Sequence, residues 1–239
     1  MKQTKYTQPA VFVYGVIKCR TSRNFKPDMV AGHSLGELVA LAATRAISYA
    51  DGVRLVHKRA IAMQAACEAQ PSGMGAVLGL DDSIIESVCA GIEEEIVVPA
   101  NYNCPGQLVI SGTDEGMRIA TDLLKEAGAR TVLRLNVHGA FHSPLMQSAS
   151  DELVEAIEAT EFKVPSVPIY QNVTARPTKD PEEIKANLIQ HLTSPVRWTQ
   201  TIENMLLDEA RYFIEVGARS VLSGMVKRID RKINPLVMQ

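Results

Sequence analysis

Between positions 7 and 67, apolar residues recur at the spacing of amphipathic helices. One short stretch at 29–31 interrupts this helical pattern, because all of its residues are apolar. That stretch is an unbroken apolar run beside turn residues, so it predicts a buried strand. Thr7 is expected to cap the helix before the strand, because the proline two residues on suits a first helical turn. Pro71-Ser72-Gly73 is expected to end the pattern. The helices are expected at about 7–17, 37–43 and 48–67.

The middle of the chain carries strand and helix patterns in the order β-α-β-β-α-β, which is typical of a ferredoxin-like unit. Asn103-Cys104-Pro105-Gly106 is expected to be a turn between two of the strands. Because other alternating segments flank this unit, we interpret it as a subdomain at 73–137 inserted into a core made of 1–72 and 138–239. The strands are expected at 76–80, 96–100, 107–111 and 130–135, and the helices at 81–92 and 115–127.

The last third of the chain continues the alternation of helices and strands, with neither repeats nor low-complexity tracts. The fold class is therefore α/β, an expected α/β-hydrolase-like core with the ferredoxin-like subdomain inserted. The patterns predict strands at 167–170 and 212–216, helices at 144–160, 181–192 and 198–207, and a final helix near the end.

The segment Gly32-His33-Ser34-Leu35-Gly36 fits the G-x-S-x-G pattern of a nucleophile elbow, in which a serine stands on a sharp turn from strand to helix. The expected strand before it and helix after it supply the context that this pattern needs. Glycines permit the strained backbone, and the turn exposes the hydroxyl of Ser34. The pattern indicates covalent acyl transfer through Ser34, although a five-residue pattern also recurs by chance.

A serine nucleophile needs a base, and the histidines of the chain supply the candidates. The side chain of His33 is expected to point away from the nucleophile around the turn. His57 is expected on a solvated helix face. His138 and His142 flank a loop that leaves the inserted unit, and His142 precedes a helix, a position that suits a base reaching into a cleft.

Arg59 lies on an apolar helical stripe, four residues from Leu55 and from Met63. An arginine there either extends its charged end to water or pairs with an anion. The sequence leaves both readings open, and the second predicts a bidentate clamp on a substrate carboxylate.

Composition narrows the class of protein. The 239 residues are 46% hydrophobic and 22% charged with a net charge of −2, which offers no electrostatic case for binding nucleic acid or an anionic membrane. No apolar run near the start is long enough for a signal peptide or a membrane span. The cysteines, which form no C-x-x-C pair or metal-ligand spacing, are expected to be free thiols of a cytoplasmic protein. They are Cys19, Cys67, Cys89 and Cys104.

Several motifs in a fixed order resemble the malonyl-CoA:acyl carrier protein transacylase family of bacterial type II fatty-acid synthesis, over about residues 6–233. They are Gly-His-Ser-Leu-Gly-Glu (32–37), Lys-Arg-Ala-Ile-Ala-Met-Gln (58–64), Asn-Cys-Pro-Gly-Gln-Leu-Val-Ile-Ser-Gly (103–112), Gly-Ala-Phe-His-Ser-Pro-Leu-Met (139–146) and Ser-Pro-Val-Arg-Trp (194–198).

The resemblance implies a ping-pong transfer of malonyl from malonyl-CoA to the phosphopantetheine thiol of acyl carrier protein, through a malonyl-serine ester. It implies no metal and no redox cofactor. The roles that it implies are Ser34 as nucleophile, His142 as general base, the backbone N–H of Leu35 in the oxyanion hole, Arg59 on the malonyl carboxylate, Met63 and Phe141 around the acyl group, and His191 at the position that orients the catalytic histidine.

The sequence departs from the family in three places. Residues 1–31 do not match its N-terminal strand and Gly-Gln-Gly-x-Gln loop, whose backbone supplies a second oxyanion donor; a truncated start and impaired turnover are therefore expectations. His191 replaces the usual glutamine, which would preserve a backbone contact and lose a side-chain amide contact. Residues 215–219 replace a Gly-Pro-Gly turn, so a reshaped turn is expected there.

Two other functions remain open at this point. An α/β-class serine hydrolase would carry an acidic residue between Ser34 and His142 in chain order, and Asp114 and Asp122 lie in that interval, both on the inserted unit. A non-enzymatic remnant would retain only carrier-protein binding. Its docking surface would be a basic cluster that equally fits a solvated helix end, Lys227, Arg228, Arg231 and Lys232.

Overall fold

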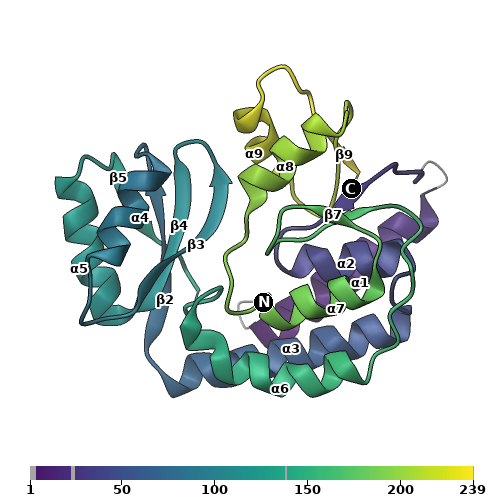
Figure 1. Cartoon of the computed structure of the whole chain (residues 1–239), viewed down its shortest axis with the longest axis horizontal. Coiled ribbons are helices and arrows are strands. Elements are labelled where there is room, and N and C mark those ends of the chain that lie inside the picture. The colour runs from purple at the N-terminus through teal and green to yellow at the C-terminus, as the bar shows by residue number, and fades with distance from the viewer. Residues whose placement is uncertain (1–3, 23–24, 138, 239) are drawn as a thin grey trace.

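A four-stranded antiparallel sheet with its helices occupies one end of the molecule, and a larger group of helices around short strands occupies the other (Figure 1). This computed structural model describes residues 4–22, 25–137 and 139–238. The segment around residues 196–199 joins the two parts, because Val196 exchanges backbone hydrogen bonds with Ala100 and Tyr102 of the sheet.

The four-stranded sheet has the strand order β3-β4-β2-β5, which confirms the predicted ferredoxin-like β-α-β-β-α-β arrangement. One face of it packs against two helices around a buried apolar core that includes Val77, Ile85, Ile110 and Leu124. The elements are β2 (Ser72–Leu78), α4 (Asp82–Ala90), β3 (Val97–Cys104), β4 (Gln107–Thr113), α5 (Asp114–Glu126) and β5 (Thr131–Arg134).

The helical pattern ends before Pro71-Ser72-Gly73, as predicted, because α3 stops at Ala69. Two predictions about the strand bounds of this sheet were wrong. The strand expected at 76–80 is β2, which already begins at Ser72, where it pairs with Thr113. The turn after β3 is confined to Pro105 and Gly106, and Asn103 belongs to the strand. In both places pairing with β4 outweighs the local turn preference of small and polar residues.

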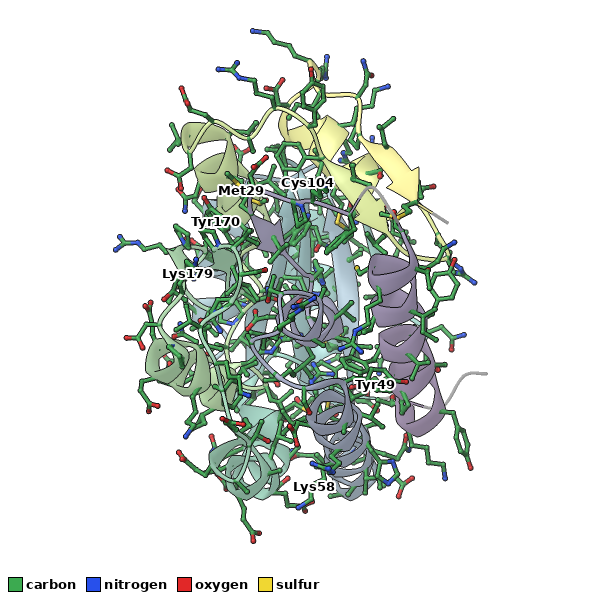
Figure 2. All side chains as sticks on the ribbon, turned by 90° about the vertical axis from the view of Figure 1, so that its right-hand side faces the viewer. Met29, Tyr49, Lys58, Cys104, Tyr170 and Lys179 are labelled. Carbon is green, nitrogen blue, oxygen red and sulfur yellow. The ribbon has the colours of Figure 1, made fainter. Side chains whose placement is uncertain are left out.

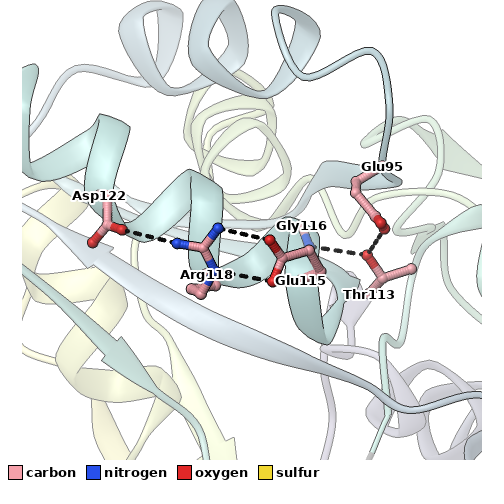
Figure 3. A network of polar contacts seen from close by, with 6 residues as sticks. All are labelled: Glu95, Thr113, Glu115, Gly116, Arg118 and Asp122. Carbon is pink, nitrogen blue, oxygen red and sulfur yellow. Dashed lines mark hydrogen bonds and ion pairs between the residues drawn. The ribbon is translucent and has the colours of Figure 1, made fainter.

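The start of α5 shows why the helix begins where the sequence indicates (Figure 3). The Thr113 side chain accepts a hydrogen bond from the backbone N–H of Gly116, at 3.1 Å, and donates one to Glu95. This cap satisfies one N–H that the first helical turn leaves free. Arg118 pairs with Glu115 and Asp122 on the same helix, but these side chains are exposed and each pair contributes little.

The larger part is built on the parallel pair β1 (Val30–Ala31) and β6 (Ile169–Tyr170), with β7 (Pro177–Thr178) antiparallel to β6. Met29 and Tyr170 lie next to one another where the parallel strands meet (Figure 2). The surrounding helices are α1 (Thr4–Thr21), α2 (Leu35–Ala43), α3 (Tyr49–Ala69), a 3₁₀ turn (Pro144–Met146), α6 (Gln147–Glu158) and α7 (Pro181–Gln190).

The first helix differs from the prediction that Thr7 caps it. In the structure α1 already includes Thr4, so Thr7 lies inside the helix. Packing explains the difference: Phe12 is fully buried against α3, where a Cβ added at Gly52 would lie 2.4 Å from its ring. Tyr49, at the start of α3, also stacks on Phe12, with ring centroids 6.2 Å apart.

The predicted start of α3 is confirmed by its cap. The Ser48 side chain accepts a hydrogen bond from the backbone N–H of Asp51, at 3.0 Å. The last elements also follow the prediction, except that β7 and β9 are strands too short for a periodic pattern to reveal. They are α8 (Trp198–Leu207), β8 (Ile214–Val216), α9 (Leu222–Ile229) and β9 (Leu236–Met238), with β8 and β9 parallel.

Replacing Phe12 with alanine should lower the free energy of unfolding by about 3–5 kcal/mol, because the substitution leaves a cavity between α1 and α3. The matched control is Val11→Ala on the outer face of the same helix, where the side chain is 49% exposed and the expected change is within about 0.5 kcal/mol. Denaturant unfolding followed by circular dichroism measures both. Similar losses for the two variants would contradict the packing described for α1.

Candidate active site

Ser34 stands on a sharp turn between β1 and α2, as the G-x-S-x-G pattern predicts. Its φ of 52° and ψ of −110° are backbone angles that residues with side chains rarely adopt, at a cost of about 1–3 kcal/mol. The turn is tight: a Cβ added at Gly32 would lie 2.0 Å from the carbonyl carbon and oxygen of Gly36. Only glycine therefore fits at position 32, and the turn presents the Ser34 side chain at the carboxyl end of β1.

The imidazole of His142 lies against the Ser34 hydroxyl, with 2.8 Å between Oγ and Nε2. Its other nitrogen, Nδ1, faces the backbone carbonyls of His191 at 3.0 Å and Ser194 at 3.1 Å. Carbonyls only accept hydrogen bonds, so Nδ1 carries the proton and Nε2 is free to accept the proton of Ser34. This is the tautomer that a general base requires.

A carboxylate does not take this orienting place among the described residues. Asp114 is half exposed and pairs with Arg134, and Asp122 is exposed and pairs with Arg118. Neither acidic residue contacts His142, so the geometry does not favour the serine hydrolase alternative. Two backbone carbonyls do what an aspartate does in a hydrolase triad, without adding a negative charge beside the imidazole.

Burial above all, and then the positive charge of Arg59 and the nearby His33, lower the pKa of His142 to about 3. The imidazole is only 3% exposed. It is therefore neutral, and able to take a proton, far below the pH at which an ordinary histidine becomes charged.

Arg59 reaches the same hydroxyl from the other side. Its Nη2 donates a hydrogen bond to Ser34 Oγ at 3.1 Å, and its Nη1 donates to the side-chain oxygen of Gln8. The side chain is 2% exposed, so it does not extend to water, and burial lowers its pKa to about 10. Its Nε has no hydrogen-bond partner among the described residues. A buried guanidinium with a free N–H suits an anionic ligand.

Gln8 is a site residue that the sequence analysis missed. It is 8% exposed, it accepts from Arg59, and its amide donates to the sulfur of Met63 at 3.3 Å. Its position four residues before Phe12 places it on the buried face of α1, and a glutamine on an apolar face was the available signal.

The remaining predicted residues gather around the same turn. Met63 is buried beside Gln8, and Phe141 packs where the apolar cores of the two parts meet. The carbonyl of Phe141 accepts from the Ser111 hydroxyl at 2.6 Å, which ties the His142 loop to the four-stranded sheet. Leu35 is the first residue of α2, where helical N–H groups lack an intrahelical partner.

Of the other described histidines, none contacts Ser34 Oγ. His33 is bonded to Asn103 of β3, with 2.9 Å between Nε2 and Oδ1, and its ring lies 5.6 Å from that of Trp198. His57 is exposed on α3, as predicted, and His138 lies outside the described residues. The side chain of His191 is buried. Its Nε2 lies 3.3 Å from the side-chain oxygen of Asn172, its ring is tilted against that of His142 with centroids 5.4 Å apart, and its backbone carbonyl accepts from Nδ1 of the base.

Within the ranges that the structure describes, no helix is long and apolar enough to cross a membrane. The same residues contain no group of three or more histidine, cysteine or acidic side chains that could hold a metal ion.

The fold and this serine–histidine pair define the class of protein, an acyl transferase, and the model of the acyl transferase domain family matches residues 1–235. The chain is 39% identical over 239 residues to the malonyl CoA-acyl carrier protein transacylase of Bacillus subtilis (strain 168), a match that spans 98% of this chain and 75% of that relative. The chain therefore belongs to the malonyl CoA-acyl carrier protein transacylase family.

Solved structures agree. The malonyl CoA-acyl carrier protein transacylase from Coxiella burnetii is 37% identical with a TM-score of 0.94, over 99% of this chain and 76% of that one. The acyl carrier protein S-malonyltransferase from Vibrio cholerae is 38% identical with a TM-score of 0.95, over 98% of this chain and 78% of that one. The predicted fold, an α/β-hydrolase-like core with a ferredoxin-like subdomain, is confirmed.

Replacing Gly32 with alanine should destabilise the protein by about 2 kcal/mol or more, because the new methyl group has no space against the backbone of Gly36. Gly36→Ala is the matched control, since a Cβ there meets nothing within 4 Å, and its expected change stays within about 1 kcal/mol. The measurement is the free energy of unfolding in denaturant. If Gly32→Ala proved as stable as Gly36→Ala, the turn would not be as tight as described.

The imidazole of His142 should remain neutral between about pH 8 and about pH 5, because burial and Arg59 oppose its charging. Nitrogen chemical shifts in protein labelled at histidine, assigned with His142→Gln, test this directly. A titration midpoint near 6.5 would contradict it. Since the unfolded chain gains a proton near pH 6.5 and the folded chain does not, this residue should also make folding less stable as the pH falls below that value.

Proposed function

We propose that the chain transfers a malonyl group from malonyl-CoA to the thiol of an acyl carrier protein, in fatty-acid synthesis. One observation carries the proposal: the Ser34 hydroxyl lies between a neutral base and a buried guanidinium, donating to His142 and accepting from Arg59. The family supports the same reaction. A relative 35% identical, with a TM-score of 0.95, is described as a malonyl-transacylase in complex with a type II polyketide acyl-carrier protein.

In the first half of the reaction, His142 Nε2 takes the proton of Ser34 as Oγ attacks the thioester carbonyl of malonyl-CoA. The backbone N–H of Leu35, the first residue of α2, would stabilise the oxyanion that forms. The carbon–sulfur bond then breaks, the proton returns from His142 to the CoA sulfur, and a malonyl-Ser34 ester remains.

In the second half, the carrier thiol gives its proton to His142 and its sulfur attacks the ester carbonyl. The carbon–oxygen bond breaks, and the proton passes to Ser34 Oγ, which restores the enzyme. The transfer changes no oxidation state, so it needs no redox cofactor. We also propose that it uses no metal, because His142 supplies the base and backbone N–H groups supply the oxyanion donors, with malonyl-CoA as substrate.

Arg59 is the residue that we propose selects the malonyl group. Its free Nε and its Nη2 near Ser34 leave donors for a carboxylate attached to the acyl chain. Met63 and Phe141 would line the same acyl site. An acetyl group would leave the buried charge unpaired, which disfavours it.

We also propose that residues 73–137 act as a subdomain of a core formed by 1–72 and 138–239. The four-stranded sheet has its own buried core, and a second core lies among the helices around β1. Asn103 and Ser111 of the sheet contact His33 and the His142 loop, so the catalytic groups lie where the two parts meet.

The basic cluster of Lys227, Arg228, Arg231 and Lys232 remains the proposed contact for the acidic carrier protein. These side chains lie on or just after α9; Lys227 and Arg228 are exposed, and Arg228 donates to Gln107 at 2.9 Å.

The described cysteines are free thiols, which suits the cytoplasm as the proposed location. The chain spans about 75% of the length of its relatives.

Incubation with malonyl-CoA and a holo acyl carrier protein should produce malonyl-carrier protein, detected by mass spectrometry, and Ser34→Ala should produce none because it lacks the attacking oxygen. His57→Ala, on an exposed face of α3, is the matched control and should act as the wild type does. Equal transfer by the wild type and by Ser34→Ala would contradict the proposed function.

Arg59→Ala should lower kcat/KM for malonyl-CoA by about 10²-fold or more, because it removes charged donors to the carboxylate. The same change should not lower kcat/KM for acetyl-CoA and should raise it, since that substrate lacks the group Arg59 binds and no longer meets an unpaired charge. Steady-state transfer rates with each donor measure the ratio. Equal losses for the two donors would assign Arg59 to a role other than recognition.

A further inference from the structure

Asn172 is a fully buried residue just beyond the carboxyl end of β6, the strand that pairs with β1. Its side-chain oxygen accepts a hydrogen bond from the backbone N–H of Ser34 at 2.7 Å. Its side-chain nitrogen donates to the carbonyl oxygen of Gly32 at 2.6 Å. One side-chain amide therefore makes hydrogen bonds to both sides of the strained turn that carries the nucleophile.

The same amide oxygen also touches the elements that hold the base. The ring of His191 donates to it, with 3.3 Å between Nε2 and Oδ1. The backbone carbonyl of His191 in turn accepts from Nδ1 of His142 at 3.0 Å. A short chain of contacts thus runs from the nucleophile turn to the imidazole.

The backbone of Asn172 is fixed as well. Its N–H donates to the carboxylate of Glu37 at 2.7 Å, and its carbonyl accepts from the N–H of Arg197 at 3.0 Å. Glu37 is fully buried at the start of α2, and Gln171 donates to its second oxygen at 3.1 Å. Burial raises the pKa of Glu37 to about 7, while these donors favour its charged form.

We propose that Asn172 is a positioning residue that holds the Ser34 turn and, through His191, the imidazole of His142 at the separation that proton transfer requires. Asn172 does not touch Ser34 Oγ, so it acts through the backbone. The inference rests on Ser34 being the nucleophile of the proposed function.

The chemistry of the turn explains why asparagine occupies this place. The Ser34 N–H needs an acceptor and the Gly32 carbonyl needs a donor, and a side-chain amide supplies one of each. Alanine would leave both backbone groups buried without partners. An ionised aspartate would keep the acceptor and place a second oxygen against the Gly32 carbonyl. A protonated carboxyl would again supply one acceptor and one donor.

The experiment compares Asn172→Ala and Asn172→Asp with the wild type. Asn204→Ala is the matched control, because its amide makes one hydrogen bond, to the Ala175 carbonyl at 2.8 Å, and does not contact the turn. Two rates are measured by intact mass: acylation of Ser34 at saturating malonyl-CoA, and labelling by a small fluorophosphonate, which reports serine activation without an acyl donor. Circular dichroism establishes that each variant is folded at the temperature used.

We expect Asn172→Ala to slow both rates by about 10²-fold, with the half-saturating malonyl-CoA concentration changed less than about threefold, because misplaced groups react slowly even when substrate is bound. Asn204→Ala should stay within about twofold of the wild type. For Asn172→Asp, the rate relative to wild type should rise as the pH falls from about 8 to about 5.5, when the introduced carboxyl gains its proton.

If Asn172→Ala is folded and both of its rates stay within about threefold of the wild type, the inference is overturned. It is also overturned if the substitution raises only the half-saturating malonyl-CoA concentration and leaves the saturated rate unchanged. If Asn172→Ala does not fold, the test is the pH dependence of Asn172→Asp. A ratio of its rate to the wild-type rate that does not change with pH overturns the inference. If the wild type is labelled by the fluorophosphonate but not by malonyl-CoA, the proposed function fails, and the labelling rates still test Asn172.

Discussion

The strained backbone of Ser34 is the constraint on which the site depends. A residue with φ near 52° between a short strand and a helix keeps this conformation only if its surroundings hold it there. β1 is too short to do this by its own pairing, because it is bonded to β6 through two residues. The remaining restraint comes from the tight approach of Gly32 to Gly36 and from the two hydrogen bonds that the Asn172 side chain makes to the turn.

The electrostatics of the site follow from burying the positive charge of Arg59 between a neutral base and the buried carboxyl group of Glu37. Burial and then Arg59 lower the pKa of His142, which keeps the imidazole neutral and free to accept a proton. In the proposed complex, the carboxylate of a malonyl group would offset that charge and raise the basicity of His142. An acyl group without a carboxylate would not, so recognition and base strength are linked through Arg59. Backbone carbonyls orient His142 without adding a further charge.

Local patterns were enough to predict the elements with strong periodicity and the residues with local signals. A few neighbouring residues are enough to predict the amphipathic α5, the capped α3 and the turn at Ser34. The short strands β7 and β9 do not, and β2 begins in a Ser-Gly stretch because it pairs with a distant strand. Residues such as Gln8 and Asn172 were missed for the same reason. Their partners lie on other elements, and a polar residue on a buried face shows no partner in the sequence.

The intact mass of the protein after brief exposure to malonyl-CoA without carrier protein is the measurement that tests the central claim most directly. The account predicts a gain of one malonyl group, located by peptide mapping on Ser34, which disappears when a carrier thiol is added. Folded protein that gains no malonyl group, or that gains one on another residue, would contradict the assignment of Ser34 as the acylated nucleophile.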